Sequence, residues 1–496
     1  MSQKFSYLLI TFLLATHFNT YAQFADSLKI EIGTTGTIAS EDYQPLWLVS
    51  NKFGTIADRK SDLSTNIRLS NIHWLGKKAA DKTNSTANEF YIKYGISIYN
   101  NQHFDKAFLE EGYIKAGYKK WQVRAGRFEE TTGDMDHNLS SGSLGISGNA
   151  LPIPKIGIAI IDYIPVPYTN GFVQFKAQLS HGWFGNNRYM KDAYLHEKTF
   201  YLQLGKKKLK LYGGLQHFAE WGGRRGTMQL EKSWKGFFDV LLVKAADDGS
   251  VGTGVNGILP NRPGDQRGLL EAGFKWENEK LVIHGYQQTP FETGRDVDVR
   301  NIDRLLGLSF SSKNEKSILK KVVGELLYTK DMLSFVEQAD RQSYYNNGFY
   351  KTGWEYQDRI VGTPLFINRV RGSKYFSEYT PYNWDSPDNT IYGNDNIINN
   401  RVVGLHLGVL YGLGSKLEAK TLLTYTRNYG THSTTSPFIP HKNQWYTLQQ
   451  VTYQSPVAGL LLTAGIAFDS GELSDNTGFM FGIKKQFSNL SSKTKK

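Results

Sequence analysis

Apolar and polar side chains alternate with a period of two along most of this chain, and this pattern limits what it can fold into. Between residues 89 and 99 every even-numbered side chain is apolar, whereas the odd-numbered ones include Lys93 and Ser97. Segments 171–183 and 399–411 repeat the pattern. Because successive side chains of a β-strand point to opposite faces, the alternation predicts strands with one apolar and one polar face.

About eighteen antiparallel strands are predicted, and the fold class is therefore all-β. An even number of strands returns both ends of a bacterial barrel to the periplasmic side. The predicted strands are 30–39, 63–74, 89–99, 107–118, 121–128, 155–165, 171–183, 198–205, 209–219, 268–276, 280–288, 303–311, 318–329, 399–411, 416–428, 443–453, 457–468 and 476–487.

The connections between these strands differ in length according to which end of the strands they join. At one end all but the first are short: 75–88, 119–120, 166–170, 206–208, 277–279, 312–317, 412–415 and 454–456. Those at the other end are longer: 129–154, 184–197, 220–267, 289–302, 330–398 and 429–442. Short periplasmic turns and long extracellular loops are typical of a transmembrane outer-membrane β-barrel. A soluble β-sandwich has no reason to follow this rule.

The N-terminus predicts export. Lys4 is followed by an apolar run from Phe5 to Ala15 and then by Thr20, Tyr21 and Ala22, which is the pattern of a secretory signal peptide cleaved before Gln23. We expect a signal peptide at 1–22, a single barrel domain at 23–487 and a basic tail at 488–496. The expected location is the bacterial outer membrane.

Composition narrows the choice of partners. The chain has no cysteine, which excludes disulfides and a lipid anchor on an N-terminal cysteine. No later segment has about twenty uninterrupted apolar residues, as a membrane-spanning helix requires. The formal charge of +12 favours anionic surfaces such as lipopolysaccharide. We expect outer-membrane lipid as a partner, no nucleic acid, and a monomeric barrel.

One helix is predicted within the loop 220–267. Apolar residues recur at helical spacing over 228–242, namely Leu230, Trp234, Phe237, Phe238, Leu241 and Leu242. We expect this helix to pack across the mouth of the barrel and to close it. The alternative is a surface helix that presents its apolar face to a partner.

Histidines and glutamates gather where two predicted strands reach the outer rim. His196 and Glu197 precede one strand, and His217 and Glu220 end the next. No second histidine follows His196 at the spacing of a zinc-protease helix. A hydrolase there, acting through Glu197 or Glu220, would need a nucleophile or a second carboxylate at a set separation. We expect no metal, no cofactor and no catalytic residue.

The predicted outer loops are rich in aromatic and amide side chains, as in SYYNNGFYKTGWEYQDR at 343–359. Sugar C–H faces stack on aromatic rings, and sugar hydroxyls pair with planar polar groups. The expected stacking residues are Trp221, Tyr344, Tyr345 and Trp354, and the expected hydrogen-bonding residues are His217, Asn346, Asn347 and Arg359. The alternative is that these side chains only pack the loops together.

Several stretches together resemble the capsule assembly Wzi family of outer-membrane proteins. They include PLWLVSNKFG, SHGWFGNNRYMKDAYLHEK, GLQHFAEWGG, PFETGRDVDVRNIDRLLGL and YYNNGFYKTGWEYQDRIVGTPL. The resemblance implies an eighteen-stranded barrel that acts as a lectin for capsular or extracellular polysaccharide at the cell surface, in capsule assembly or attachment, and not as an enzyme. A solute channel remains the alternative, because eighteen strands enclose a wide lumen.

Overall fold

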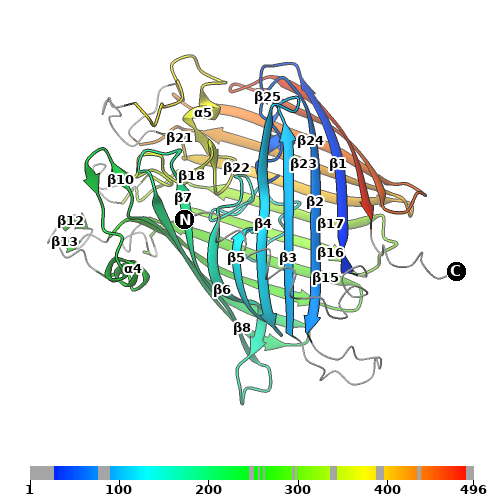
Figure 1. Cartoon of the computed structure of the whole chain (residues 1–496), viewed down its shortest axis with the longest axis horizontal. Helices are drawn as coiled ribbons and strands as arrows, with labels where there is room; N and C mark the ends of the chain where they lie inside the picture. Colours follow the sequence, from blue (N-terminus) through cyan, green and yellow to red (C-terminus); the bar gives the residue numbers. More distant parts are fainter. Residues whose placement is uncertain are drawn as a thin grey trace, which may run out of the picture.

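A computed structural model describes residues 27–75, 90–244, 251–254, 257–260, 263–292, 297–298, 300–335, 343–386, 396–432 and 437–487 (Figure 1). The predicted signal peptide at 1–22, the tail at 488–496 and most of the turn 75–88 lie outside these residues. Among the described residues, no helix is long and apolar enough to cross a membrane.

Eighteen antiparallel strands form one closed barrel, as predicted. Each strand pairs with its neighbours along the chain, and β1 closes the sheet by pairing with β26, so that Ile38 lies opposite Phe479. The barrel strands are β1 (Lys29–Ala39), β2 (Ser61–Leu75), β3 (Phe90–Asn101), β4 (Lys106–Tyr118), β5 (Trp121–Arg127), β6 (Lys155–Pro165), β7 (Val173–Gly185), β8 (Ala193–Lys206), β9 (Leu209–Trp221), β14 (Asp265–Glu277), β15 (Leu281–Phe291), β16 (Arg304–Ser312), β17 (Leu319–Tyr328), β22 (Val402–Leu413), β23 (Leu417–Asn428), β24 (Lys442–Gln454), β25 (Leu460–Gly471) and β26 (Asn476–Phe487).

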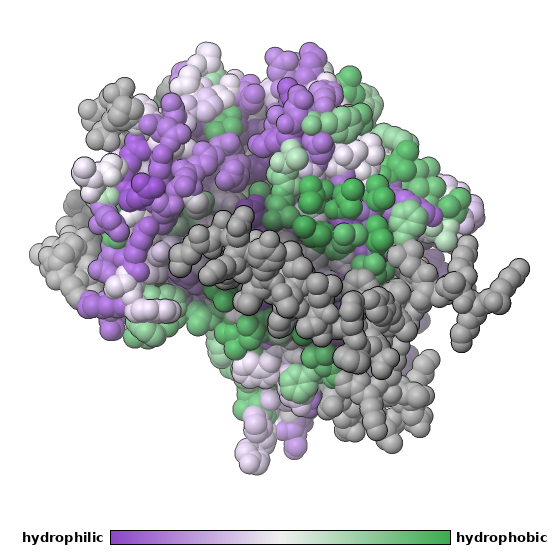
Figure 2. Space-filling view, viewed as in Figure 1, coloured by the Kyte–Doolittle hydropathy of each residue, from purple (hydrophilic) through white to green (hydrophobic). Residues whose placement is uncertain are grey.

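The two faces of the wall have opposite chemistry. On β26, Phe479, Phe481 and Ile483 point outward and are about half exposed, whereas Lys484 points into the bore and pairs with Glu31 at 2.9 Å. Figure 2 shows hydrophilic residues over the external loops and apolar residues over the barrel strands. Exposed apolar side chains on a closed wall are what a lipid environment requires.

The remaining elements belong to the long external connections. Among the described residues, three short helices, α3 (Leu46–Val49), α4 (Trp234–Leu241) and α5 (Arg369–Gly372), lie in the connections 40–60, 222–264 and 329–401. The same connections carry four two-stranded hairpins: β10 (Arg224–Arg225) with β11 (Met228–Gln229), β12 (Val251–Gly254) with β13 (Gly257–Pro260), β18 (Glu355–Tyr356) with β19 (Arg359–Ile360), and β20 (Ile367–Asn368) with β21 (Ile397–Asn399).

Three external connections, 40–60, 128–154 and 329–401, fold into the outer part of the bore. They share a buried apolar cluster that includes Trp47, Leu139, Tyr344 and Trp354. Polar side chains of the inner wall bind the inserted backbone: Glu325 accepts from the N–H of Ser141 at 2.6 Å, and Gln288 accepts from that of Leu144 at 3.0 Å. The inserted loops therefore have a hydrophobic core of their own and are hydrogen-bonded to the wall.

Helix α4 lies within the predicted range 228–242 but begins only at Trp234, after its N-cap Ser233, and its predicted position across the mouth is wrong. The ring of Phe237 lies 5.9 Å from His196 and 6.3 Å from Trp221. The residues next to these two in sequence face inward: Glu197 binds Lys155 and Glu220 binds Arg188 in the bore. His196 and Trp221 therefore face outward. The helix therefore packs on the outer surface of the barrel, at the left in Figure 1.

An arginine on the lipid face should destabilise the barrel, because no water hydrates it there. We expect Phe481→Arg to lower the free energy of unfolding from lipid vesicles by about 2–4 kcal/mol, measured by urea titration. Gln486→Arg adds the same charge on the inner face of the same strand and should change stability little. Equal stability of Phe481→Arg and the wild type would contradict the lipid-facing assignment.

Candidate functional site: a cavity between the external loops

A cavity of about 290 Å³ lies between the loops at the external end of the barrel. Its walls come from the connection 40–60, the β3–β4 hairpin around Gln102, the end of the connection 128–154, and residues 357–371. Four segments that are distant in sequence thus meet around one cavity.

Arg359 joins two of these segments. Its guanidinium donates to the carbonyl oxygens of Val49 at 3.0 Å and Ile56 at 2.6 Å. Asn149 lies across the cavity and donates to the carbonyl oxygen of Ile360 at 2.9 Å. Because a guanidinium has five donors in a fixed plane, Arg359 sets the distance between the loops.

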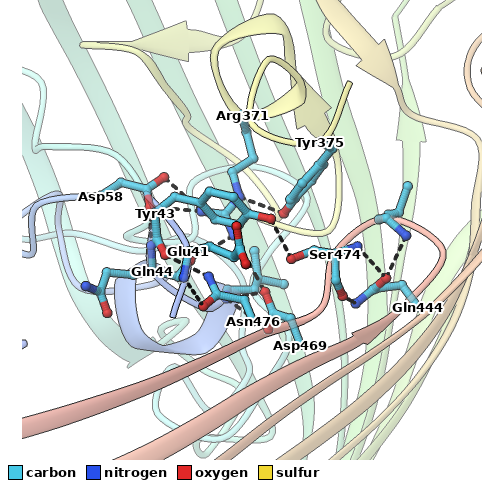
Figure 3. Close-up of polar contacts among 12 residues, drawn as sticks. Glu41, Tyr43, Gln44, Asp58, Arg371, Tyr375, Gln444, Asp469, Ser474 and Asn476 are labelled. Atoms are coloured by element: carbon cyan, nitrogen blue, oxygen red, sulfur yellow. Dashed lines mark hydrogen bonds and ion pairs between the residues drawn. The ribbon is translucent and has the colours of Figure 1, made fainter. Parts of the chain in front are cut away.

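Arg371 joins residues 357–371 to the connection 40–60 a second time, and Figure 3 draws it with its partners. It donates to Asp58 at 2.8 and 3.0 Å, to the carbonyl oxygen of Gln44 at 3.0 Å and to Tyr375 Oη at 2.6 Å. Asp469, on strand β25, lies 3.6 Å away and accepts from the N–H of Leu46. One arginine therefore ties two loops to the barrel wall.

The electrostatics of this network favour the charged forms. Burial would raise the pKa of Asp58, but Arg371 and Arg359 hold it below its ordinary value. Burial would lower the pKa of Arg371, but Asp58 and neighbouring groups hold it well above its ordinary value. The ion pair is therefore formed throughout the physiological pH range.

Other polar groups in the cavity wall are available for a ligand. Gln357 and Asp358 are exposed at the tip of the β18–β19 hairpin, and Lys106 is exposed on β4. The side-chain oxygen of Asn101 is buried and has no hydrogen-bond partner among the described residues. The ring of Phe108 is half buried in the same wall and stacks on Tyr99 at 5.9 Å. The cavity thus offers hydrogen-bonding groups and one aromatic ring.

Most of the residues predicted to contact sugar lie beneath this surface. Tyr344, Tyr345, Asn346 and Trp354 are buried and donate, in that order, to Asp303 Oδ2, Leu144 O, Ile397 O and Gly145 O. Asn347 donates to Asp265 at 3.0 Å. Of the eight predicted residues, Arg359 lines the cavity. Sugar contact by the others stays a prediction.

His217 and Trp221 lie elsewhere, on the outer surface of the wall beneath α4. The two predicted His–Glu pairs at the rim are split by the strand: His196 and His217 point outward, with rings 6.2 Å apart, whereas Glu197 and Glu220 point into the bore. A single catalytic or metal site cannot use both sets.

One acidic cluster in the described residues has the spacing of metal ligands. Glu110, Glu111 and Glu129 place carboxylate oxygens within 4.8 Å of one another in the bore. Arg68 already lies among them, 3.1 Å from Glu110 and 3.6 Å from Glu111, and also pairs with Glu129. The guanidinium thus pairs with all three carboxylates.

Most of the cavity residues could not be identified from local sequence patterns. Asp58 and Arg371 are 313 residues apart, so no local pattern connects them. Asn101, Gln102 and Phe108 belong to a short external hairpin whose composition is not unusual. Gln357 to Arg359 do fall within the aromatic and amide-rich stretch that we singled out.

The fold and the cavity define an integral outer-membrane β-barrel whose external end is filled by its own loops. The chain belongs to the family described as Capsule assembly protein Wzi, whose profile matches residues 48–367. No curated protein sequence matches it.

One solved structure shows the same fold at low sequence identity. Wzi of Escherichia coli, an outer-membrane protein involved in group 1 capsule assembly and described as a carbohydrate-binding β-barrel, is 12% identical with a TM-score of 0.58, covering 97% of this chain and 87% of that chain. OpdL of Pseudomonas aeruginosa is 10% identical with a TM-score of 0.45, covering 93% of this chain and 98% of that chain.

Removing the Arg371 side chain should loosen the loops without opening the barrel. Arg371→Ala leaves Asp58 without its guanidinium partner, and we expect docking of the loops to weaken by about 1–3 kcal/mol. The measurement is limited proteolysis of the folded protein in detergent, with cleavage expected within 40–60 and 369–376. Unchanged protease resistance would show that Arg371 does not hold these loops.

The pH dependence of the same contact provides the control. A carboxyl with a lowered pKa in the folded state stabilises that state above its ordinary pKa of about 3.9 and loses the effect as pH falls through the lowered value. The difference in protease resistance between the wild type and Asp58→Asn should therefore be constant from about pH 5 to 8 and vanish at lower pH.

Proposed function

We propose that this protein is a non-enzymatic lectin of the outer membrane that binds capsular or extracellular polysaccharide in the external cavity and takes part in capsule assembly or attachment. The observation that carries the proposal is the cavity itself, an external recess with amide, charged and aromatic groups on its wall. Membership of the Capsule assembly protein Wzi family supports it, as does the description of Escherichia coli Wzi as a carbohydrate-binding β-barrel.

The cavity suits a short part of a polymer. At about 290 Å³ it is at the lower limit of typical small-ligand sites, which span roughly 300–1,000 Å³, so it holds one or a few sugar residues at a time. Each contact is weak, but a repeating polymer rebinds from a high local concentration and engages many barrels on one cell. Retention at the surface then needs no tight single site.

Individual residues have different proposed roles. The Asn101 oxygen accepts a hydrogen bond from a sugar hydroxyl, Gln357 and Asp358 bind further hydroxyls, and Phe108 packs on a C–H face. Arg359 contributes its remaining guanidinium donors. Tyr344, Tyr345, Asn346, Asn347 and Trp354 support the loops from beneath. The proposed mature chain begins at Gln23 and works as a monomer.

Loss of the proposed sugar contacts should weaken binding without harming the fold. Asn101→Ala with Phe108→Ala removes one hydrogen bond and one stacking surface, for which we expect a loss of about 1–3 kcal/mol, or roughly 5- to 150-fold in affinity. Co-sedimentation with the native polysaccharide measures it. Lys313→Ala, in a periplasmic turn, serves as the control. Equal retention by the wild type, the double variant and Lys313→Ala would show that the glycan site lies elsewhere.

The alternative of a solute channel predicts a different electrical property. Because the inserted loops fill the outer bore, we expect a conductance in planar bilayers far below that of an open eighteen-stranded pore. Deleting residues 131–147, part of the inserted loop 128–154, should raise it, provided that the heat-modifiable gel mobility of a folded barrel is kept. A large, steady conductance of the wild type would favour the channel.

A further inference from the structure

Helix α4 has an apolar surface much larger than the barrel wall covers. The face toward the wall contains Val240, which is fully buried, and Phe237. These side chains pack on Trp221, His181 and His196, which point outward from three neighbouring strands.

A second set of apolar side chains on α4 points away from the wall. Trp234 is 76% exposed, Phe238 50% and Leu242, at the C-cap, 61%. At 100° per residue these positions lie on one side of the helix, next to the buried face. Such side chains would be costly to leave in water.

The polar side chains of α4 form a separate stripe. On α4, Lys235 pairs with Asp239 at 2.8 Å, and Lys244, beyond the end of the helix, pairs with the same carboxylate at 3.1 Å. The helix thus has three sides: one against the wall, one apolar and open, and one charged. This is the pattern of a helix that lies at the interface between lipid and water.

The height of α4 on the barrel matches that interface. Below His196 on β8, the outward residues Phe200, Leu202 and Leu204 are exposed apolar side chains of the lipid-facing wall. The outward Lys198 lies above them and donates to the carbonyl oxygen of Leu241 at the end of α4. The helix therefore lies where the apolar wall meets the external surface.

We propose that α4 is an interfacial membrane helix, with Trp234, Phe238 and Leu242 inserted among the acyl chains of the outer leaflet. The open face of α4 continues the lipid-facing wall, so the same lipid covers both. The helix fixes the base of the connection 222–264 at the membrane surface. This role is independent of the polysaccharide site.

Because the chain has no cysteine, single cysteines can be labelled specifically to test the proposal. Phe238→Cys and Lys235→Cys are each labelled with an environment-sensitive fluorophore in the full-length barrel, reconstituted in phosphatidylcholine vesicles with or without brominated acyl chains. Phe481→Cys on the lipid face is the reference for strong quenching. Tyr168→Cys, at a fully exposed position in a periplasmic turn, is the reference for weak quenching.

The expected result is quenching at position 238 close to that at 481 and several-fold stronger than at 235 and 168. Quenching at 238 no stronger than at 168 would overturn the proposal. Protection of position 238 from aqueous iodide without quenching by bromine would also overturn it, because protein would then cover this face. Heat-modifiable mobility on gels confirms that each variant is folded.

Discussion

A backbone inside a bilayer has no water to bind, so every N–H and C=O must find a partner in the protein. In this chain the requirement is met by eighteen strands whose last member pairs with the first. Closure leaves only the side chains to distinguish the two sides of the wall. Every second strand residue faces lipid and is apolar, whereas the residues between them face the bore and can be polar.

The inner polar face is what allows the external loops to enter the bore. Inserted backbone carries N–H groups that need acceptors, and Glu325, Gln288 and Asp469 accept from them at 2.6 to 3.0 Å. Aromatic side chains then fill the space between the loops. With no cysteine available, packing and buried ion pairs hold this arrangement, and the cavity is the recess that the loops leave between them.

The strands could be predicted from sequence because the period of two is a local signal that the lipid imposes on every strand. Loop positions could not, because they depend on distant pairs such as Asp58 with Arg371. Composition singled out residues 343–359 for sugar contact, and within this stretch Tyr344 and Trp354 are buried in the core of the inserted loops. Helix α4 was also predicted. Its apolar residues cover an arc wide enough for it to pack on the inner or the outer side of the wall. The outward direction of His196 and Trp221 decides between the two positions.

Alternation also decides which residues can act together. His196 and Glu197 are adjacent in sequence, but one faces the outer surface beneath α4 and the other binds Lys155 inside the bore. In a barrel wall, neighbours in sequence thus belong to different environments, and a chemical site must use residues of the same parity or residues from loops. The cavity follows this rule: Asn101 and Phe108 are both inward-facing strand residues, and loops supply most of its other walls.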